Sequence, residues 1–178
     1  MDSINQRQPE HNHEDLTGVD AVRKLKQIVH IAGTCFFCTS NRNGGTADTR
    51  PMRVLQTDDE GNLWFLSADD SHKNQELEAN PSVELFFQGA PNSDYLHVRG
   101  IATVSRDKAK IHELWNFALK TWFTGGEDDP RITVIKVRPT DCYYWDTKHG
   151  NIVAGVKILI GAAIGKTLDD SIEGSLKV

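Results

Sequence analysis

Apolar residues first occur at a regular spacing after a polar N-terminal segment. Residues 1–14 show no apolar period, so they are predicted to form a disordered tail ahead of a domain that covers residues 15–178. The next residues have helical spacing, and Asp15 or Thr17 is the expected N-cap. The apolar face of this predicted helix consists of Val22, Leu25, Ile28 and Val29.

Beyond this helix the hydrophobic pattern changes to short runs with a period near two. Runs rich in β-branched and aromatic residues predict strands at residues 34–40, 50–57, 63–67, 83–88, 95–104, 131–137 and 142–146. Turn-forming residues separate several of these runs, at residues 41–45, 58–62 and 89–94. Short strands joined by tight turns favour a mainly β fold, an antiparallel barrel with flanking helices, over a doubly wound parallel sheet.

Three further segments have the spacing of helices. A short helix is predicted over residues 71–79, because Pro81 discourages helical geometry at Asn80. A longer helix is predicted over residues 107–123, and a last one over residues 152–164. The longer helix has a continuous apolar stripe, which comprises Ile111, Leu114, Trp115, Ala118, Leu119 and Trp122.

The bulk properties of the 178-residue chain fit a single domain with an ordinary core. A net charge of -5 argues against nucleic acid as the main partner, although a local site can still bind a small anion. The three cysteines form no disulfide framework and suit a reducing compartment. No segment has the apolar length of a secretion signal or a membrane span, so we expect a cytoplasmic location and no membrane partner.

One segment has the chemistry of an anion site. Ser71, His72 and Lys73 stand at the start of a predicted helix that directly follows a strand. Helix starts present unpaired N–H groups, to which Ser71 adds a hydroxyl and Lys73 a positive charge, so together they suit a phosphate. The alternative from these residues alone is an ordinary serine cap followed by a solvated lysine.

Arg50 offers a second positive charge at the start of a predicted strand. Pro51 cannot donate a ladder hydrogen bond, so this strand is expected at an edge or near a bulge, where backbone groups stay free for a ligand. A surface arginine that binds nothing is the equally supported alternative. Cys35 and Cys38 do not predict a metal site, because residues three apart in a strand point to opposite faces. No metal is expected, and no side chain stands out as a catalytic acid, base or nucleophile.

These segments together resemble the pyridoxamine 5′-phosphate oxidase-like family of FMN-binding split barrels. The segment S-H-K-N-Q-E-L-E-A-N-P (residues 71–81) resembles the family's S-x-K-x-x-x-L-x-x-N-P motif, and L-W-F-L-S (residues 63–67) resembles a strand beside the flavin ring. The resemblance implies FMN as the cofactor. It places Ser71, His72, Lys73 and Arg50 at the phosphate, and Pro51, Met52, Arg53, Leu66 and Ser67 beside the ring.

The second half of the chain resembles the general stress protein group of that family. The matching segments are H-E-L-W-N (residues 112–116), K-T-W-F-T-G-G-E-D-D-P (residues 120–130) and Y-Y-W-D (residues 143–146). This group implies a homodimer with FMN at the subunit interface, where Trp115 or Trp122 would reach the flavin site of the other subunit.

Two function classes follow from the resemblance. One is an FMN-dependent oxidoreductase that receives electrons from NADH or NADPH, and the other is a non-catalytic protein that holds or buffers flavin. A split barrel that carries deazaflavin or haem is a third, weaker alternative. Trp145 is followed by Asp146-Thr147-Lys148-His149 and not by the Arg-x-His motif of true pyridoxamine 5′-phosphate oxidases, so that activity is not expected.

Overall fold

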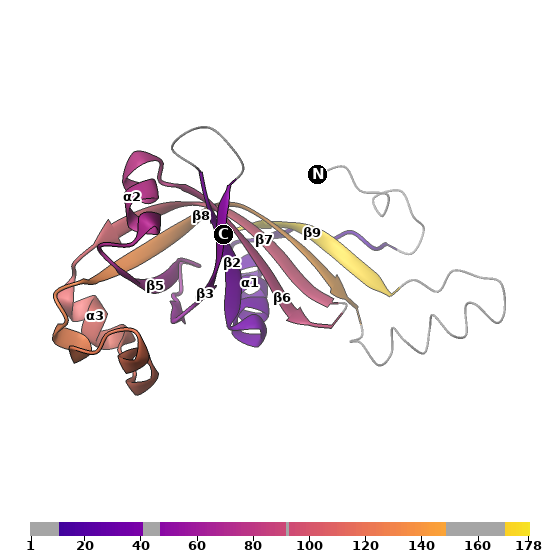
Figure 1. The fold of residues 1–178 in the computed structure, drawn as a ribbon. Helices are drawn as coiled ribbons and strands as arrows, with labels where there is room; N and C mark the ends of the chain where they lie inside the picture. Colours follow the sequence, from indigo (N-terminus) through magenta and orange to yellow (C-terminus); the bar gives the residue numbers. More distant parts are fainter. Residues whose placement is uncertain (1–10, 41–46, 92, 149–169) are drawn as a thin grey trace.

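A ring of antiparallel strands forms the body of the protein (Figure 1). The computed structural model describes residues 11–40, 47–91, 93–148 and 170–178. The strands of the ring are β2 (Thr34–Thr39), β3 (Asp48–Arg53), β4 (Gln56–Thr57), β5 (Leu63–Ala68), β6 (Ser82–Ala90), β7 (Ser93–Ser105) and β8 (Ile132–Thr147).

The ring closes because the chain bends between β3 and β4. Strand β3 pairs with β2, whereas β4 pairs with β5, and the amide of Leu55 in the bend already donates to the carbonyl oxygen of Trp64 at 2.9 Å. From β2 the antiparallel pairing continues through β6, β7 and β8 back to β5. The predicted mainly β fold, an antiparallel barrel with flanking helices, is confirmed.

Alternate side chains of the strands fill the barrel. Phe37 and Phe65 are fully buried and meet edge to face, with ring centroids 5.4 Å apart. On β2 the alternation places Cys35, Phe37 and Thr39 inside and Phe36 outside. The period-two pattern of the sequence therefore corresponds to the two faces of the barrel wall.

Strand β8 is continuous where the sequence predicted two separate strands. Its first half pairs with β5 and its second half with β9 (Ser171–Lys177), while β7 pairs along both halves. Pro139, which has no N–H, stands at the change of partner, opposite Gly100 and a bulge in β7. A Cβ atom on Gly100 would lie 2.7 Å from the carbonyl oxygen of Arg138, so this crossing point requires glycine.

Helix α1 (Gly18–Ala32) packs its apolar face against the barrel core. Thr17, one of the two expected caps, is its N-cap. Gly33 ends the helix at a φ of 63°, and its N–H donates to the carbonyl oxygen of Val29 at 2.8 Å. The buried residues of the helix are Ala21, Leu25, Ile28 and Val29.

The predicted helix over residues 107–123 is wrong in its second half. Two shorter elements stand there, α3 (Lys108–Leu114) and the 3-10 helix η2 (Phe117–Thr121). Trp115 separates them with extended backbone angles, φ -65° and ψ 136°. The break has a local cause, because the side chain of Asn116 accepts the N–H of Ala118 at 3.1 Å, and asparagine favours such caps over helix interiors.

A second apolar cluster lies where α3 and η2 cover the outer side of β5 and β8. Its buried members are Leu66, Ile111, Leu114, Leu119, Phe123, Ile132 and Val134. The break at Trp115 lets Leu119 and Phe123 face the same cluster as α3, and it leaves Trp122 66% exposed. Trp122 is therefore not part of a continuous helical stripe, contrary to the prediction.

The two ends of the described chain meet along β9, a strand that the sequence did not predict. Strand β9 extends the sheet beyond β8 and pairs in parallel with β1 (Leu16–Thr17). The amide of Glu14 donates to the carbonyl oxygen of Glu173 at 2.8 Å, and Asn12 is buried. Residues 12–14, which fall in the predicted tail, thus lie against the sheet.

The remaining helical segments are α2 (His72–Ala79), between β5 and β6, and the short η3 (Gly126–Asp128), before β8. The helix predicted over residues 152–164 lies outside the described residues. None of the helices in the described part of the chain is long and apolar enough to cross a membrane.

Candidate functional site

The predicted anion segment forms the start of α2, directly after β5. Ser71 is the N-cap, and its Oγ accepts the N–H of Asn74 at 3.3 Å. Asn74 Nδ2 donates to Thr133 Oγ1 on β8 at 2.8 Å, and that hydroxyl donates to the carbonyl oxygen of Ser67 at 3.0 Å. Buried hydrogen bonds therefore fix the first turn of α2 to the end of β5.

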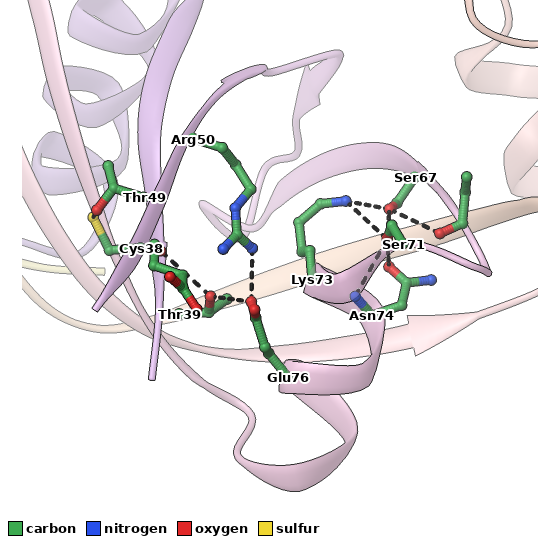
Figure 2. Close-up of polar contacts among 11 residues, drawn as sticks. Cys38, Thr39, Thr49, Arg50, Ser67, Ser71, Lys73, Asn74 and Glu76 are labelled. Carbon is green, nitrogen blue, oxygen red and sulfur yellow. Dashed lines mark hydrogen bonds and ion pairs between the residues drawn. The ribbon is translucent and has the colours of Figure 1, made fainter. Parts of the chain in front are cut away.

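Lys73 turns back from α2 toward the end of β5. It is only 7% exposed, its ammonium donates to Ser67 Oγ, and it lies 3.5 Å from Ser71 Oγ. The two serine hydroxyls are themselves 3.2 Å apart, so one ammonium and two hydroxyls form a compact group (Figure 2). The alternative of a solvated lysine after a serine cap is wrong.

Arg50 reaches the same region from β3. Its Nη1 donates to Glu76 Oε2 at 2.8 Å, and Thr39 Oγ1 donates to the same oxygen at 2.5 Å. Figure 2 shows the Lys73 ammonium directed toward Ser67 and Ser71, and the Arg50 guanidinium paired with Glu76. We call Arg50, Ser67, Ser71, Lys73 and Glu76 the charged cluster.

The positive charges of Lys73 and Arg50 lie near each other in the charged cluster, and Glu76 pairs with Arg50. Burial, and next the positive charge of Arg50, lower the pKa of Lys73 from 10.5 to about 8, against the opposing effect of Glu76. Burial pushes the pKa of Glu76 upward, but hydrogen bonds from Thr39 and Arg50 outweigh it and hold this pKa below its ordinary value. Lys73 and Glu76 are therefore mainly charged at neutral pH, and together with the Arg50 guanidinium their charges sum to +1, next to the side chain of Asp48 at Glu76.

The residues predicted to border a flavin ring have different surroundings from one another. The side chain of Met52 packs against the barrel core, and that of Leu66 packs under α3. Ser67, which was assigned to the ring, instead hydrogen-bonds Lys73. Three further predicted site residues are exposed, namely Pro51, Arg53 and His72. Contact of any of them with a ring stays a prediction.

The two tryptophans assigned to the site have different surroundings. Trp115 is half-buried and packs against Phe123, with ring centroids 6.4 Å apart. Trp122 projects into solvent. Their contact with a second subunit's site also stays a prediction.

Sequence reasoning missed Glu76, Thr39, Asn74 and Thr133. Glu76 carried a signal, because it stands three residues after Lys73 and so shares its face of α2. The two threonines carried none, since they reach the cluster only through the closure of the barrel.

A protein-family model described as "Pyridoxamine 5'-phosphate oxidase like" matches residues 20–169. The chain belongs to this family. The matched region includes the barrel strands β2 to β8 and every residue of the charged cluster, so the barrel described above is the split-barrel fold of this family. The family resemblance stated from the sequence motifs is confirmed.

The chain is also similar to general stress proteins. It is 28% identical to general stress protein 26 of Bacillus subtilis over 83 residues, which are 44% of this chain and 58% of that protein. The structure of general stress protein 26 of Bacillus anthracis superposes with a TM-score of 0.62 at 26% identity, over 69% of this chain and 92% of that one. The general stress group assigned from the motifs is confirmed by both comparisons.

A second similar structure is that of a flavin-binding protein. The general stress FMN/FAD binding protein of Xanthomonas citri superposes with a TM-score of 0.60 at 21% identity, over 69% of this chain and 86% of that one. At this identity the likeness shows the shared fold. The chain spans 55 to 58% of the lengths of the curated relatives that it matches.

Proposed function

We propose that this protein binds FMN and holds the flavin phosphate in the charged cluster. One observation carries the proposal: the Lys73 ammonium is buried near the Arg50 guanidinium, and it donates to the uncharged hydroxyl of Ser67 while Glu76 pairs with Arg50. Burying an uncompensated positive charge is costly, so a fold that needs only stability would not retain this arrangement. A bound anion would remove the imbalance.

The donors of the cluster fit a phosphate monoester. The ammonium of Lys73 has three N–H donors, and it lies at hydrogen-bond distance from the hydroxyls of Ser67 and Ser71. The guanidinium of Arg50 has five N–H donors, and its Nη1 donates to Glu76. The serine hydroxyls and the start of α2 add donors on the same side. When bound, FMN would supply the electron-accepting ring, and the chain's own residues would hold and orient its phosphate end.

Comparing FMN with riboflavin tests this proposal directly, because the two ligands differ only by the phosphate. We expect FMN to bind at least about 100-fold more tightly in titration calorimetry, since two charged donors each contribute roughly 1.5–3 kcal/mol. Equal affinities for FMN and riboflavin would refute the phosphate assignment.

We further propose that the protein is a homodimer that completes its flavin sites at the interface. Across the outer face of the barrel, strand pairing aligns a row of side chains: Pro51, Phe36, Phe86, His97 and Tyr143. We call it the aromatic row. Within it, Phe36 is 59% exposed and Phe86 43% exposed, and His97 stacks on Phe86 with ring centroids 4.4 Å apart.

A second copy of this chain is the occupant that the aromatic row suits. Beside the row lie both charge signs, in the exposed pair Arg99 and Asp141 at 2.9 Å, so the surface can be self-complementary about a two-fold axis. The row ends at Pro51, the residue after Arg50. Successive side chains of a strand alternate in direction, so Arg50 lies on the other face of β3. A dimer formed through the aromatic row would bring the partner subunit to the edge strand that carries Arg50.

For the chemistry, we propose an FMN-dependent oxidoreductase that takes electrons from NADH or NADPH. The ring itself would accept the hydride, so no side-chain acid or base is required. A flavin-holding protein without turnover is the second candidate, and the charged cluster favours it, because its two cations would bind the phosphate end and take no part in electron transfer.

Anaerobic reduction of the FMN-loaded protein separates these candidates. Bleaching of the flavin band by NADH or NADPH is expected for the oxidoreductase, and its absence would leave the holding function. Pyridoxamine 5′-phosphate is expected to leave the flavin oxidised. Of the residues that the structure describes directly after Trp145, Asp146 is bound to Lys24 and Lys148 to Asn12, so these two do not offer a second phosphate clamp.

A further inference from the structure

Glu76 is an acid placed inside a cluster that otherwise attracts anions. Its carboxylate is 12% exposed, and one oxygen, Oε2, accepts both from Arg50 and from Thr39 (Figure 2). Phosphate and carboxylate oxygens make the same charge-assisted hydrogen bonds to a guanidinium. The carboxylate of Glu76 therefore lies on a donor that the proposed phosphate would use.

We propose that Glu76 competes with the flavin phosphate for Arg50 and so keeps bound FMN exchangeable. This inference rests on the proposed function. The carboxylate weakens phosphate binding in two ways: it occupies a guanidinium donor, and its negative charge repels the incoming dianion. It also stabilises the flavin-free protein, because it is the counter-charge of Arg50 and Lys73.

The direction of the effect follows from the net charge of the cluster. Arg50, Lys73 and Glu76 sum to +1 with Glu76 ionised and to +2 without its charge. The side chain of Asp48, which also hydrogen-bonds Glu76, lies beside them in both cases, so the cluster becomes more positive by one unit. Since like charges within several ångströms repel appreciably at the effective dielectric of a protein surface, removing this charge should favour a dianion. The flavin-free protein should respond in the opposite direction, because two neighbouring cations lose their counter-charge.

Glu76→Gln is the test variant, because glutamine keeps an acceptor oxygen for Thr39 and Arg50 while it removes the charge. We expect FMN to bind about 5- to 50-fold more tightly, riboflavin to bind unchanged, and the flavin-free protein to melt at a lower temperature. Glu78→Gln is the matched control: it makes the same charge change on the same helix at an exposed position and should alter FMN affinity by less than about twofold.

A second variant weakens the competitor without changing its charge. Thr39→Val is close to isosteric and removes one of the two donors to Glu76 Oε2. It is expected to tighten FMN binding by about two- to fivefold and to leave riboflavin binding unchanged. This variant keeps the proposal testable should Glu76→Gln fold poorly.

Unchanged or weaker FMN binding in either variant would overturn the competition. That outcome is distinct from failure of the proposed function, which would show in the wild-type protein as equal affinity for FMN and riboflavin. A purely structural role of Glu76 would lower the melting temperature without tightening FMN binding. Tighter binding of both flavins alike would also contradict the proposal, because it would place the effect away from the phosphate.

Discussion

Replacing Lys73 with methionine is expected to stabilise the protein without flavin and, at the same time, to weaken FMN binding. The reason is the burial of a charged ammonium beside a second cation. Burial and Arg50 lower the pKa of Lys73 from 10.5 to about 8. Each pKa unit corresponds to about 1.4 kcal/mol, so the folded protein bears a cost of about 3 kcal/mol for keeping this group charged at neutral pH.

Methionine removes the charge and retains an unbranched apolar side chain in the same space. Part of the gain is offset, because the ammonium also hydrogen-bonds Ser67 Oγ, worth roughly 1.5 kcal/mol at the lower end for a charged donor. The hydroxyl of Ser67 still has Ser71 Oγ and the carbonyl oxygen of Ala68 as partners, so it is not left unsatisfied. The expected net gain is about 1–2 kcal/mol, or roughly 2–8 °C in melting temperature for a chain of this size.

The sign of the pH dependence provides a second check. Below pH 8, Lys73 is protonated in both the folded and the unfolded protein, and the full cost of burial applies. Between pH 8 and 10.5 the folded protein releases this proton first, so wild-type stability rises relative to the variant. The advantage of Lys73→Met should therefore be greatest near pH 7 and should shrink as the pH approaches 10.

Denaturant unfolding of flavin-free wild type and variant at equal protein concentration measures the stability gain, and calorimetric titration measures FMN affinity. FMN affinity should fall by about 10- to 150-fold, and riboflavin affinity should stay within about twofold. Lys108→Met, at an exposed position on α3, should change stability by less than about 0.5 kcal/mol and leave FMN binding intact. A destabilised Lys73→Met variant that still binds FMN normally would refute this account of the charged cluster.

Two further predictions concern the pH dependence of binding and the dimer. The ratio of FMN to riboflavin affinity should begin to fall between pH 7 and 8 and fall more steeply above pH 8, because the free protein loses the Lys73 proton there, and binding of the dianion then takes up a proton. Calorimetry in buffers of different ionisation enthalpy measures this uptake. Phe36→Asp should weaken dimerisation at least about 30-fold in sedimentation experiments, whereas Val19→Asp, at a more exposed apolar site outside the aromatic row, should not. A Phe36→Asp dimer of normal affinity would exclude the aromatic row as the interface.

The barrel could be predicted from the sequence because its strands alternate strongly between buried and exposed positions. Phe37 lies inside and Phe36 outside, as the alternation predicts. Strand β9 lacked this signal, because Glu173 is buried although it is charged, and Gly174 has no side chain. Both positions depend on the N-terminal segment, where Glu14 approaches so closely that a Cβ on Gly174 would clash with its backbone.

The helix prediction over residues 107–123 failed because two signals conflicted. The apolar stripe continues past Leu114 at helical spacing, but Asn116 caps a new turn and the chain extends at Trp115. Both conformations bury Leu119, so periodicity alone did not distinguish them. A capping residue within an amphipathic segment is therefore a better indicator of a helix break than the apolar stripe is of a continuous helix.

The charged cluster could likewise be predicted from the sequence only in part. A helix start with Ser71 and Lys73 predicted an anion site, and Arg50 offered a second charge, but neither indicated that the lysine would be buried. Its burial arises when β5, α2 and β3 come together around it, which is a property of the closed barrel. Glu76 becomes significant only once Arg50 is seen to pair with it.

The arrangement of these charges is better explained by ligand binding than by stability. If the cluster served the fold alone, an apolar residue in place of Lys73 would be the more stable choice, and Glu76 would be unnecessary, since its role is to offset a cation that need not be there. The presence of both residues is explained if the cluster must bind a dianion and the protein must also stay folded without that ligand. Lys73 then stabilises the bound form and Glu76 the free form, so the two residues set opposite limits on how tightly the phosphate is held. Substitutions at the two positions should for that reason change stability and FMN affinity in opposite directions, a pattern that a purely structural ion pair would not produce.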